Sequence, residues 1–295
     1  MVRSIRKAKL IDKIIIATGT TLLFLWIFIP SYWVFKTSFA PPEEAWSPLP
    51  PSKPTLDNFL SLFNPSLEAV LRGMGIRAAL PDPMIVYISN SFIVAIVSSV
   101  IGTAFGALAG YNLARFNYKG KKLVLWLVLF AYVFPIFALM VPILMIMRAI
   151  GLYNTLHGLA LVHLAYTLPF STLMLRSYFY GVPKDLEESA LIDGCSRLEA
   201  LVRITLPVSA PGLVTAFIFS FTLSWNDLLF ALILLNTSRL YTIPIATTFF
   251  LWGGEIVDPG GLSAVAVFAG IVPALLYMFV QKYIVLGLVK GAIKA

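Results

Sequence analysis

A carboxylate stands inside an apolar stretch of this sequence, where Asp227 directly follows Trp225 and Asn226. An ionised carboxylate in apolar surroundings is costly unless it is paired, hydrogen-bonded or in contact with water. An indole ring, an amide and a carboxylate together suit a carbohydrate, whose hydroxyls donate and accept hydrogen bonds. Tyr166 is a further candidate for contact with a substrate. His163 is expected to be a hydrogen-bond donor packed between helices. Two roles stay open for Asp227: contact with a substrate, or a polar contact that locks helices or subunits together.

Other reactive constellations do not occur in the sequence. There is no G-x-x-x-x-G-K-[ST] phosphate loop, since Gly120-Lys121-Lys122 lacks both the earlier glycine and the hydroxyl residue. The single Cys195 cannot form an intrachain disulfide, and with His157 and His163 it does not supply the ligands of a structural metal site. No nucleophile, base or metal-ligand set lies at one depth. The sequence therefore predicts no catalytic residues, no metal and no cofactor.

The elements that must position these side chains are membrane-spanning helices. Of the 295 residues 59% are hydrophobic and only 12% are charged, with a mean hydropathy of +0.88, whereas a soluble domain carries about 25% charged residues. A helix needs about 20 apolar residues to cross a bilayer, and strict alternation typical of barrel strands does not occur. Six spans are predicted: 14–35, 85–112, 123–147, 156–180, 208–235 and 262–286.

The basic residues predict the orientation of these spans. With the N-terminus inside, 16 of the 22 lysines and arginines lie on the cytoplasmic side, so both termini are expected in the cytoplasm of a multi-pass cell-membrane protein. Because these cations flank the spans, the net charge of +8 does not indicate a nucleic-acid partner. The expected organisation is a cytoplasmic tail 1–13, a first helix and outer loop 14–84, and a core 85–290 with five spans.

The first span and the outer loop each leave an alternative. Ser38-Phe39-Ala40 resembles a signal-peptidase site, but the preceding apolar run exceeds the ~7–15 residues of a signal-peptide core, so an uncleaved anchor is expected. After a proline-rich connector, Thr55 is expected to cap a short amphipathic helix. That helix packs on the outer membrane face or docks an external partner. The apolar side is expected to contain Leu56, Phe59, Leu60 and Phe63.

The cytoplasmic segment 181–207 is too long for a tight turn and is predicted to form two short helices. Pro183 opens the first helix, which Asp185 is expected to cap with Glu188 as its capping-box partner. Gly194 is expected to interrupt this helix. The result is a helical knob that can fit a groove on a partner protein.

The second helix of the knob is expected to begin at a capping box formed by Ser196 and Glu199 and to end at Pro207. One face is expected to contain Leu198, Leu201, Val202 and Thr205. Simple capping and helix breaking also account for Glu188 and Gly194, and these roles are compatible with docking.

The knob has a specific spacing of residues, Glu188-Ser189-Ala190, then Gly194, then Ile204-x-Leu206-Pro207, which resembles the EAA loop of ABC-importer permeases. Ser189 stands where that family usually has alanine, a change of one small residue for another. Further motifs extend the resemblance to sugar-type permeases similar to the second membrane subunit of maltose importers. They are Asn90-Ser91, Tyr111-x-x-Ala114-Arg115-Phe116, Leu152-x-Asn154-Thr155, Leu168-Pro169-Phe170 and Trp225-Asn226-Asp227.

The resemblance implies an all-α membrane protein with the type I importer fold. Its implied partners are a second permease subunit in a heterodimer, a cytoplasmic ABC ATPase dimer that binds the ATP, an external solute-binding protein and a sugar. The implied coupling residues are Glu188, Ser189, Ala190, Asp193, Gly194, Ile204, Leu206 and Pro207. The expected substrate path contains Trp225, Asn226, Asp227 and Tyr166.

Two other readings fit the sequence less well. A stand-alone secondary carrier or channel would need more ionisable groups inside the spans than Asp227, and no inverted halves are evident. Among importers, the alternative substrates are a phosphorylated polyol or a polyamine, and a polyamine path would favour more acidic groups. Kinks around the path are expected at Pro135, Pro142, Pro169 and Pro273.

Overall fold

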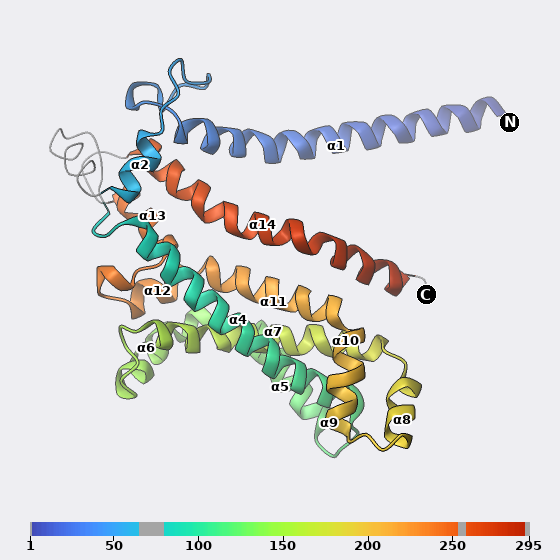
Figure 1. Ribbon diagram of the computed structural model, residues 1–295. Coiled ribbons are helices and arrows are strands. Elements are labelled where there is room, and N and C mark those ends of the chain that lie inside the picture. Colours follow the sequence, from blue (N-terminus) through green and yellow to red (C-terminus); the bar gives the residue numbers. More distant parts are fainter. Residues whose placement is uncertain (1, 65–79, 253–257, 293–295) are drawn as a thin grey trace. The chain divides into compact units, whose positions relative to one another are not determined.

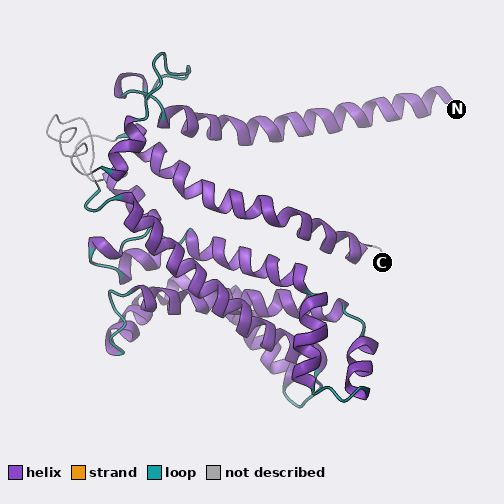
Figure 2. Cartoon of the chain, in the orientation of Figure 1, coloured by secondary structure: helices purple, strands orange, loops and turns teal. Residues whose placement is uncertain are grey.

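The computed structural model describes residues 2–64, 80–252 and 258–292, and within these ranges its regular structure is entirely helical (Figure 2). The chain forms two compact units, Met1–Ala79 with Phe249–Phe268, and Leu80–Thr248 with Ala269–Ala295. Helices α13 (Ile243–Trp252) and α14 (Pro259–Ala292) each contribute residues to both units. The all-helical membrane fold predicted from the composition is confirmed.

The first unit joins the end of α1 (Val2–Ser38) to α2 (Asp57–Phe63), with the 3-10 helix η1 (Pro42–Glu44) between them. The buried side-chain amide of Asn58 donates hydrogen bonds of 2.9 Å to the carbonyl oxygens of Ser38 and Ala40. These carbonyls lie at and beyond the last turn of α1, where no later helical N–H can reach them. A polar side chain therefore fixes the return of the chain after the first helix.

The apolar side predicted for the short helix in the outer loop is exposed at three of its four residues, which is compatible with both alternatives, the outer membrane face and an external partner. Leu56, Leu60 and Phe63 are exposed within the described chain, and the buried residues of α2 are Asn58, Ser61 and Leu62. Thr55 does accept a hydrogen bond of 3.1 Å from the backbone N–H of Asp57, but the N-cap position belongs to Leu56, whose side chain cannot cap. The predicted cap by Thr55 is therefore wrong by one position.

The second unit contains most of the spanning helices and the helical knob (Figure 1). Its complete elements are α4 (Met84–Arg115), α5 (Lys121–Val133), η2 (Ile136–Leu139), α6 (Met140–Ala149), α7 (Leu156–Gly181), α8 (Lys184–Ile192), α9 (Arg197–Ala200), η3 (Leu201–Thr205), α10 (Leu206–Val208), α11 (Ala210–Trp225), α12 (Leu229–Leu234) and η4 (Ser238–Leu240).

Four described helices are long and apolar enough to cross a membrane without interruption: Asp12–Ser38, Met84–Arg115, Leu156–Gly181 and Pro259–Gln281. They correspond to the first, second, fourth and sixth predicted spans. Two bent helix pairs raise the number of spans to six if each pair counts as one. The number of spans therefore agrees with the prediction, but two of them are not continuous helices.

The predicted continuous span 123–147 is wrong, because α5 ends at Val133 and the following helical segment is bent by 85°. Pro135 lies within the break and has no N–H with which to continue the helical ladder. Pro142 lies in the first turn of α6, where its missing N–H is not needed. By contrast, α7 and α14 continue through Pro169 and Pro273, so these prolines do not end their helices.

The predicted span 208–235 is also interrupted. The 80° bend between Arg197–Val208 and Ala210–Trp225 separates the knob from α11 at the start of this span. Within the span, α11 ends at Trp225 before the short helix α12. Asn226–Leu228 are not helical, so the backbone groups of this segment are freed from the regular ladder. Irregular backbone at membrane depth is tolerated where it is buried in protein or lines a cavity.

Helices α4 and α7 pack closely along a row of small residues, a feature that the sequence interpretation missed (Figure 1). Gly102, Gly106 and Gly110 recur every four residues on the face of α4 that meets α7. A Cβ at Gly106 would lie 2.5 Å from the Cβ of Ser171, and one at Gly110 would lie 2.8 Å from the backbone nitrogen of Arg176. The signal was available, because small residues four apart favour close helix packing in membranes.

Candidate functional site

The helical knob, residues 181–207, folds as two short helical segments joined at Gly194, whose φ of +90° explains the chain reversal. The first segment, α8, begins after Pro183, and its N-cap makes no side-chain hydrogen bond. The predicted capping of this helix by Asp185 with Glu188 is therefore wrong. Asp185 lies within the first turn of α8, where its charge still favours the positive end of the helix.

The second segment begins at the predicted capping box. Ser196 accepts a hydrogen bond from the N–H of Glu199 at 3.3 Å, and the Glu199 carboxylate accepts one from the N–H of Ser196 at 2.8 Å. Hydrogen bonds from the backbone and the side chain of Ser196 to the carboxylate, with a smaller contribution from Arg203, hold the pKa of Glu199 below its usual value. The predicted stop at Pro207 is wrong, because α10 includes this residue and the 80° bend follows at Ser209.

The predicted apolar face of the second segment is divided between buried and exposed residues. Leu201 and Thr205 are buried, whereas Leu198 and Val202 are exposed. The reason is that residues 201–205 form a π-helical turn, which changes the angular spacing of side chains from the α-helical one. The spacing of four between the two buried residues is kept, but their neighbours point away from the core.

The coupling residues expected from the motif lie on both sides of the knob. Glu188, Ser189, Asp193 and Gly194 are exposed, and Pro207 is exposed as well. Ala190 is buried, and Ile204 and Leu206 are partly buried. The exposed group forms a surface around the turn at Gly194, while the apolar group attaches this surface to the rest of the unit.

Glu187 fixes the knob to α4, and the sequence interpretation missed it. Its carboxylate is 6% exposed and accepts 2.7 Å hydrogen bonds from the Nε of Arg115 and the Oγ1 of Thr205. The hydroxyl of Tyr111 donates to the other carboxylate oxygen at 3.1 Å. Arg115 also donates to the carbonyl oxygen of Val182 at 2.9 Å.

This cluster joins three elements that lie far apart in the sequence. Tyr111 and Arg115 belong to the last turns of α4, Glu187 to α8 and Thr205 to η3. The sequence does indicate this position, because Glu187 and Ala190 are three residues apart and share one face of α8. The cluster makes the knob a rigid extension of α4.

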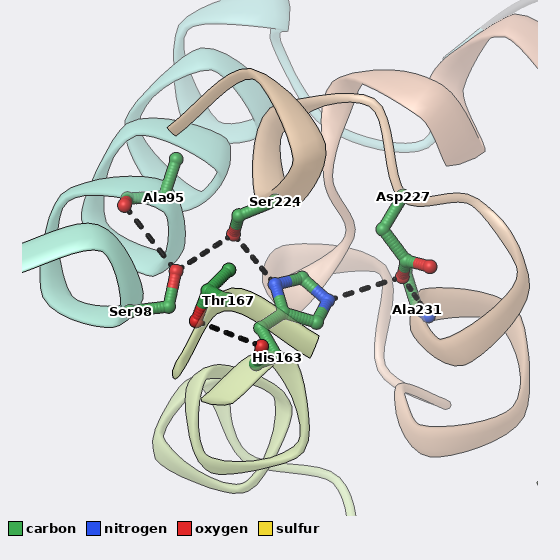
Figure 3. Close-up of polar contacts among 7 residues, drawn as sticks. All are labelled: Ala95, Ser98, His163, Thr167, Ser224, Asp227 and Ala231. Atoms are coloured by element: carbon green, nitrogen blue, oxygen red, sulfur yellow. Dashed lines mark hydrogen bonds and ion pairs between the residues drawn. The ribbon is translucent and has the colours of Figure 1, made fainter. Parts of the chain in front are cut away.

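A second polar cluster links helices at membrane depth (Figure 3). Ser98 on α4 donates to the Oγ of Ser224 on α11 at 2.9 Å, and that Oγ lies 2.6 Å from the Nδ1 of His163 on α7. The Nε2 of His163 lies 3.2 Å from Oδ2 of Asp227. The same oxygen accepts a 3.1 Å hydrogen bond from the backbone N–H of Ala231 in α12. We call Ser98, Ser224, His163 and Asp227 the polar row.

The row is satisfied when His163 is neutral with its proton on Nε2. Ser98 then donates to Ser224, Ser224 donates to Nδ1, and Nε2–H donates to the carboxylate of Asp227. The hydrogen bond from His163 offsets the desolvation penalty of the Asp227 carboxylate at membrane depth. It places His163 between helices as expected, and it gives Asp227 a locking contact, one of the two roles that the sequence left open.

The expected substrate-path residues separate in the structure. Trp225 is 1% exposed, and its Nε1 donates a 2.9 Å hydrogen bond to the carbonyl oxygen of Ala269 in α14. Tyr166, Asn226 and Asp227 instead line a cavity of about 600 Å³. The structure thus brings three of the four together and directs Trp225 into the packed interior.

Residues 102–290, which contain the knob and the carboxyl-terminal part of the polar row, match the family described as "Binding-protein-dependent transport system inner membrane component". The chain belongs to this permease family.

Two curated relatives cover almost the whole permease. The permease protein SmoH of a sulfoquinovosyl glycerol transport system from Agrobacterium fabrum is 35% identical, with 90% of this chain and 88% of the relative aligned. The permease protein MalG of a trehalose/maltose transport system from Thermococcus litoralis is 31% identical, with 98% of this chain and 99% of the relative aligned.

A crystal structure of a bacterial alginate ABC transporter, in complex with alginate pentasaccharide-bound periplasmic protein, contains a chain with a TM-score of 0.68. That chain is 15% identical and aligns over 95% of each chain, which shows that the fold is that of an ABC-importer permease.

A permease of this family is not an enzyme, although its polar row contains a serine, a histidine and an aspartate in hydrogen-bond sequence. The Ser224 side chain is buried between helices, and its oxygen already receives a hydrogen bond from Ser98. A hydrolytic nucleophile instead needs access to substrate and nearby donors for an oxyanion. The row is therefore a packing contact between α4, α7 and α11.

Proposed function

We propose that this chain is one of two permease subunits of an ATP-driven importer for a sugar or oligosaccharide. An external binding protein delivers the sugar, and a cytoplasmic ABC ATPase dimer supplies the energy. Support comes from relatives whose names state transport of a sulfoquinovosyl glycerol or of trehalose and maltose, and from the structural neighbour with its saccharide-bound periplasmic protein.

The observation that carries this proposal is the construction of the knob. Its exposed surface, formed by Glu188, Ser189, Asp193 and Gly194, stands on a base that Glu187 fixes to Arg115 of α4. When the ATPase dimer closes, a groove on each ATPase moves the knob seated in it. Because the knob is tied to α4, this motion reaches the spans as a rigid-body displacement between two packings.

Docking can be tested by replacing Gly194 with tryptophan. The side chain would project from the knob into the groove that receives it, since no atom lies within 4 Å of a Cβ at this position. We expect ATP-driven uptake and binding-protein-stimulated ATP hydrolysis to fall by at least tenfold, with permease levels in the membrane retained. The measurement is uptake and ATP hydrolysis in proteoliposomes that contain the whole transporter.

Gly120 provides a matched control, because its φ is +89° and the surroundings of its Cβ are equally open. Gly120→Trp imposes the same backbone strain at the turn before α5. It should reduce folding yield as much as Gly194→Trp does and leave coupling per folded complex near the wild-type level. Equal coupling defects in the two variants, or normal uptake by Gly194→Trp with the ATPase bound, would reject the docking site.

We also propose that both termini and the knob are cytoplasmic, as the distribution of basic residues indicates. In a Cys195→Ser background, a cysteine at Pro50 should react with an impermeant thiol reagent applied outside intact cells. A cysteine at Lys119 should react only after the membrane is opened. Both positions are exposed within the described chain, so the difference reports topology. The opposite labelling pattern would invert the permease and place the knob out of reach of the ATPase.

A further inference from the structure

We propose that the cavity beside Asp227 is a contact site in this subunit for an uncharged pyranose glycoside. This inference rests on the proposed sugar transport and deepens it. The cavity has a volume of about 600 Å³, within the range of about 300–1,000 Å³ found for small-molecule sites. It lies within the second unit, between α5, η2, α7, α11 and the interrupted segment that follows Trp225.

The walls of the cavity are aromatic. Tyr132 of α5, Phe170 of α7 and Phe219 of α11 form a row, with ring centroids 6.2 Å apart for the first pair and 5.8 Å apart for the second. Phe137 adds a fourth ring. Tyr132, Phe137 and Phe219 are about half exposed, so their rings are available to a ligand. An aromatic face carries partial negative charge, and the C–H groups on one face of a pyranose carry the complementary partial positive charge.

The polar groups of the cavity converge from facing elements. The hydroxyl of Tyr166 on α7 is shielded from solvent and has no hydrogen-bond partner among the described residues. Asp227 uses Oδ2 for both His163 and Ala231, which leaves its second carboxylate oxygen for another donor. The amide of Asn226 also lines the cavity. A buried polar atom without a partner is uncommon in proteins, and a sugar hydroxyl can donate to the carboxylate and accept from the phenol.

The charge of the cavity selects among sugars. Its described lining residues include Asp227 and contain no lysine or arginine. His163 contacts Asp227 at 3.2 Å, and this pair carries a net charge of −1 or 0 depending on whether His163 is neutral or protonated. A sulfonate or a uronate would find no compensating cation here and would lose its hydration. The site therefore suits an uncharged glycoside and disfavours an anionic one.

The test uses the whole transporter in proteoliposomes with its own binding protein at saturating concentration. The probes are radiolabelled trehalose and maltose, which are uncharged, and sulfoquinovosyl glycerol, which is anionic. The variants Tyr166→Phe and Tyr132→Leu remove one hydroxyl and one ring from the cavity. Trp126→Leu is the matched control, because Trp126 is an exposed aromatic residue of the same helix as Tyr132 and does not line the cavity.

We expect the wild type to import an uncharged probe. Both cavity variants should lower its uptake by about two- to tenfold, the range for a lost hydrogen bond or ring contact. Stimulated ATP hydrolysis should stay near the wild-type rate, and Trp126→Leu should behave as the wild type. A general structural defect would lower uptake and hydrolysis together.

Uptake by both cavity variants that equals the wild type would overturn the site and leave the proposed function intact. A parallel loss of uptake and hydrolysis in both variants would also overturn it, because the residues would then act on structure. Import of sulfoquinovosyl glycerol alone would overturn the assignment to uncharged sugars. Absence of ATP-driven uptake of any probe by the wild type would instead reject the proposed sugar transport.

Discussion

Replacing Glu187 with alanine is expected to abolish most ATP-driven uptake, although Glu187 is buried and cannot touch the ATPase. The change leaves the guanidinium of Arg115 buried without its carboxylate and removes the acceptor for Tyr111 and Thr205. Breaking a buried ion pair on one side costs about 3–5 kcal/mol. The knob would then detach from α4, so that movement of the ATPase no longer reaches the spans.

Hydrogen exchange of the purified transporter measures this detachment. In Glu187→Ala the amides of residues 184–208 should exchange faster than in the wild type, while those in the middle of α4 stay protected. Glu188→Gln is the comparison, because Glu188 lies next to Glu187 on α8 but is exposed. It should leave exchange of the knob unchanged, even if docking weakens. Wild-type exchange and normal uptake in Glu187→Ala would show that the buried cluster does not transmit the motion.

Replacing Asp227 with leucine is expected to remove most transport, whereas Asp227→Asn should retain a substantial part of it. Leucine leaves two donors, the Nε2–H of His163 and the N–H of Ala231, without an acceptor at membrane depth. An unsatisfied buried donor costs about 1–3 kcal/mol. The amide oxygen of asparagine can accept both bonds at nearly the same size, so the helices should stay joined.

ATP-dependent sugar uptake into vesicles, with membrane levels matched and with or without a protonophore, distinguishes locking from proton transfer. An amide does not ionise in the accessible pH range, so a proton-relay residue would fail in both variants. Ser98→Ala is a graded control, because it removes only the far end of the polar row. It should reduce uptake less than Asp227→Leu. Inactive Asp227→Asn, together with collapse of wild-type uptake on adding protonophore while ATP is maintained, would support a secondary carrier.

Asp227 takes part in two different contacts, one between helices and one with the cavity. Its Oδ2 accepts hydrogen bonds from His163 of the polar row and from the N–H of Ala231 in α12, and its side chain also lines the aromatic cavity. The two roles that the sequence left open are therefore compatible in this geometry. Assembly of Asp227→Leu with a partner permease would separate them, since a locking defect impairs assembly and loss of a substrate contact does not.

The membrane class and the knob follow from the sequence alone, and so does the number of spans if each bent helix pair counts as one. Long apolar runs determine span number because the bilayer imposes one length on every crossing helix. The turn at Gly194 and the capping box of Ser196 and Glu199 are local as well, since each depends on residues within a few positions. These features could be predicted because neighbours along the chain decide them.

The pairing of polar residues, by contrast, depends on how the helices pack. The partners of Glu187 lie 72 and 76 positions before it and 18 after it, and the row from Ser98 to Asp227 joins three helices. The breaks before α6 and α12 likewise depend on what the freed backbone meets in the folded unit. A single sequence fixes the type and spacing of such residues, but burial and hydrogen bonding arise between segments that meet only when the helices pack. For this reason the knob could be predicted from its motif, whereas its attachment to α4 through Glu187 could not.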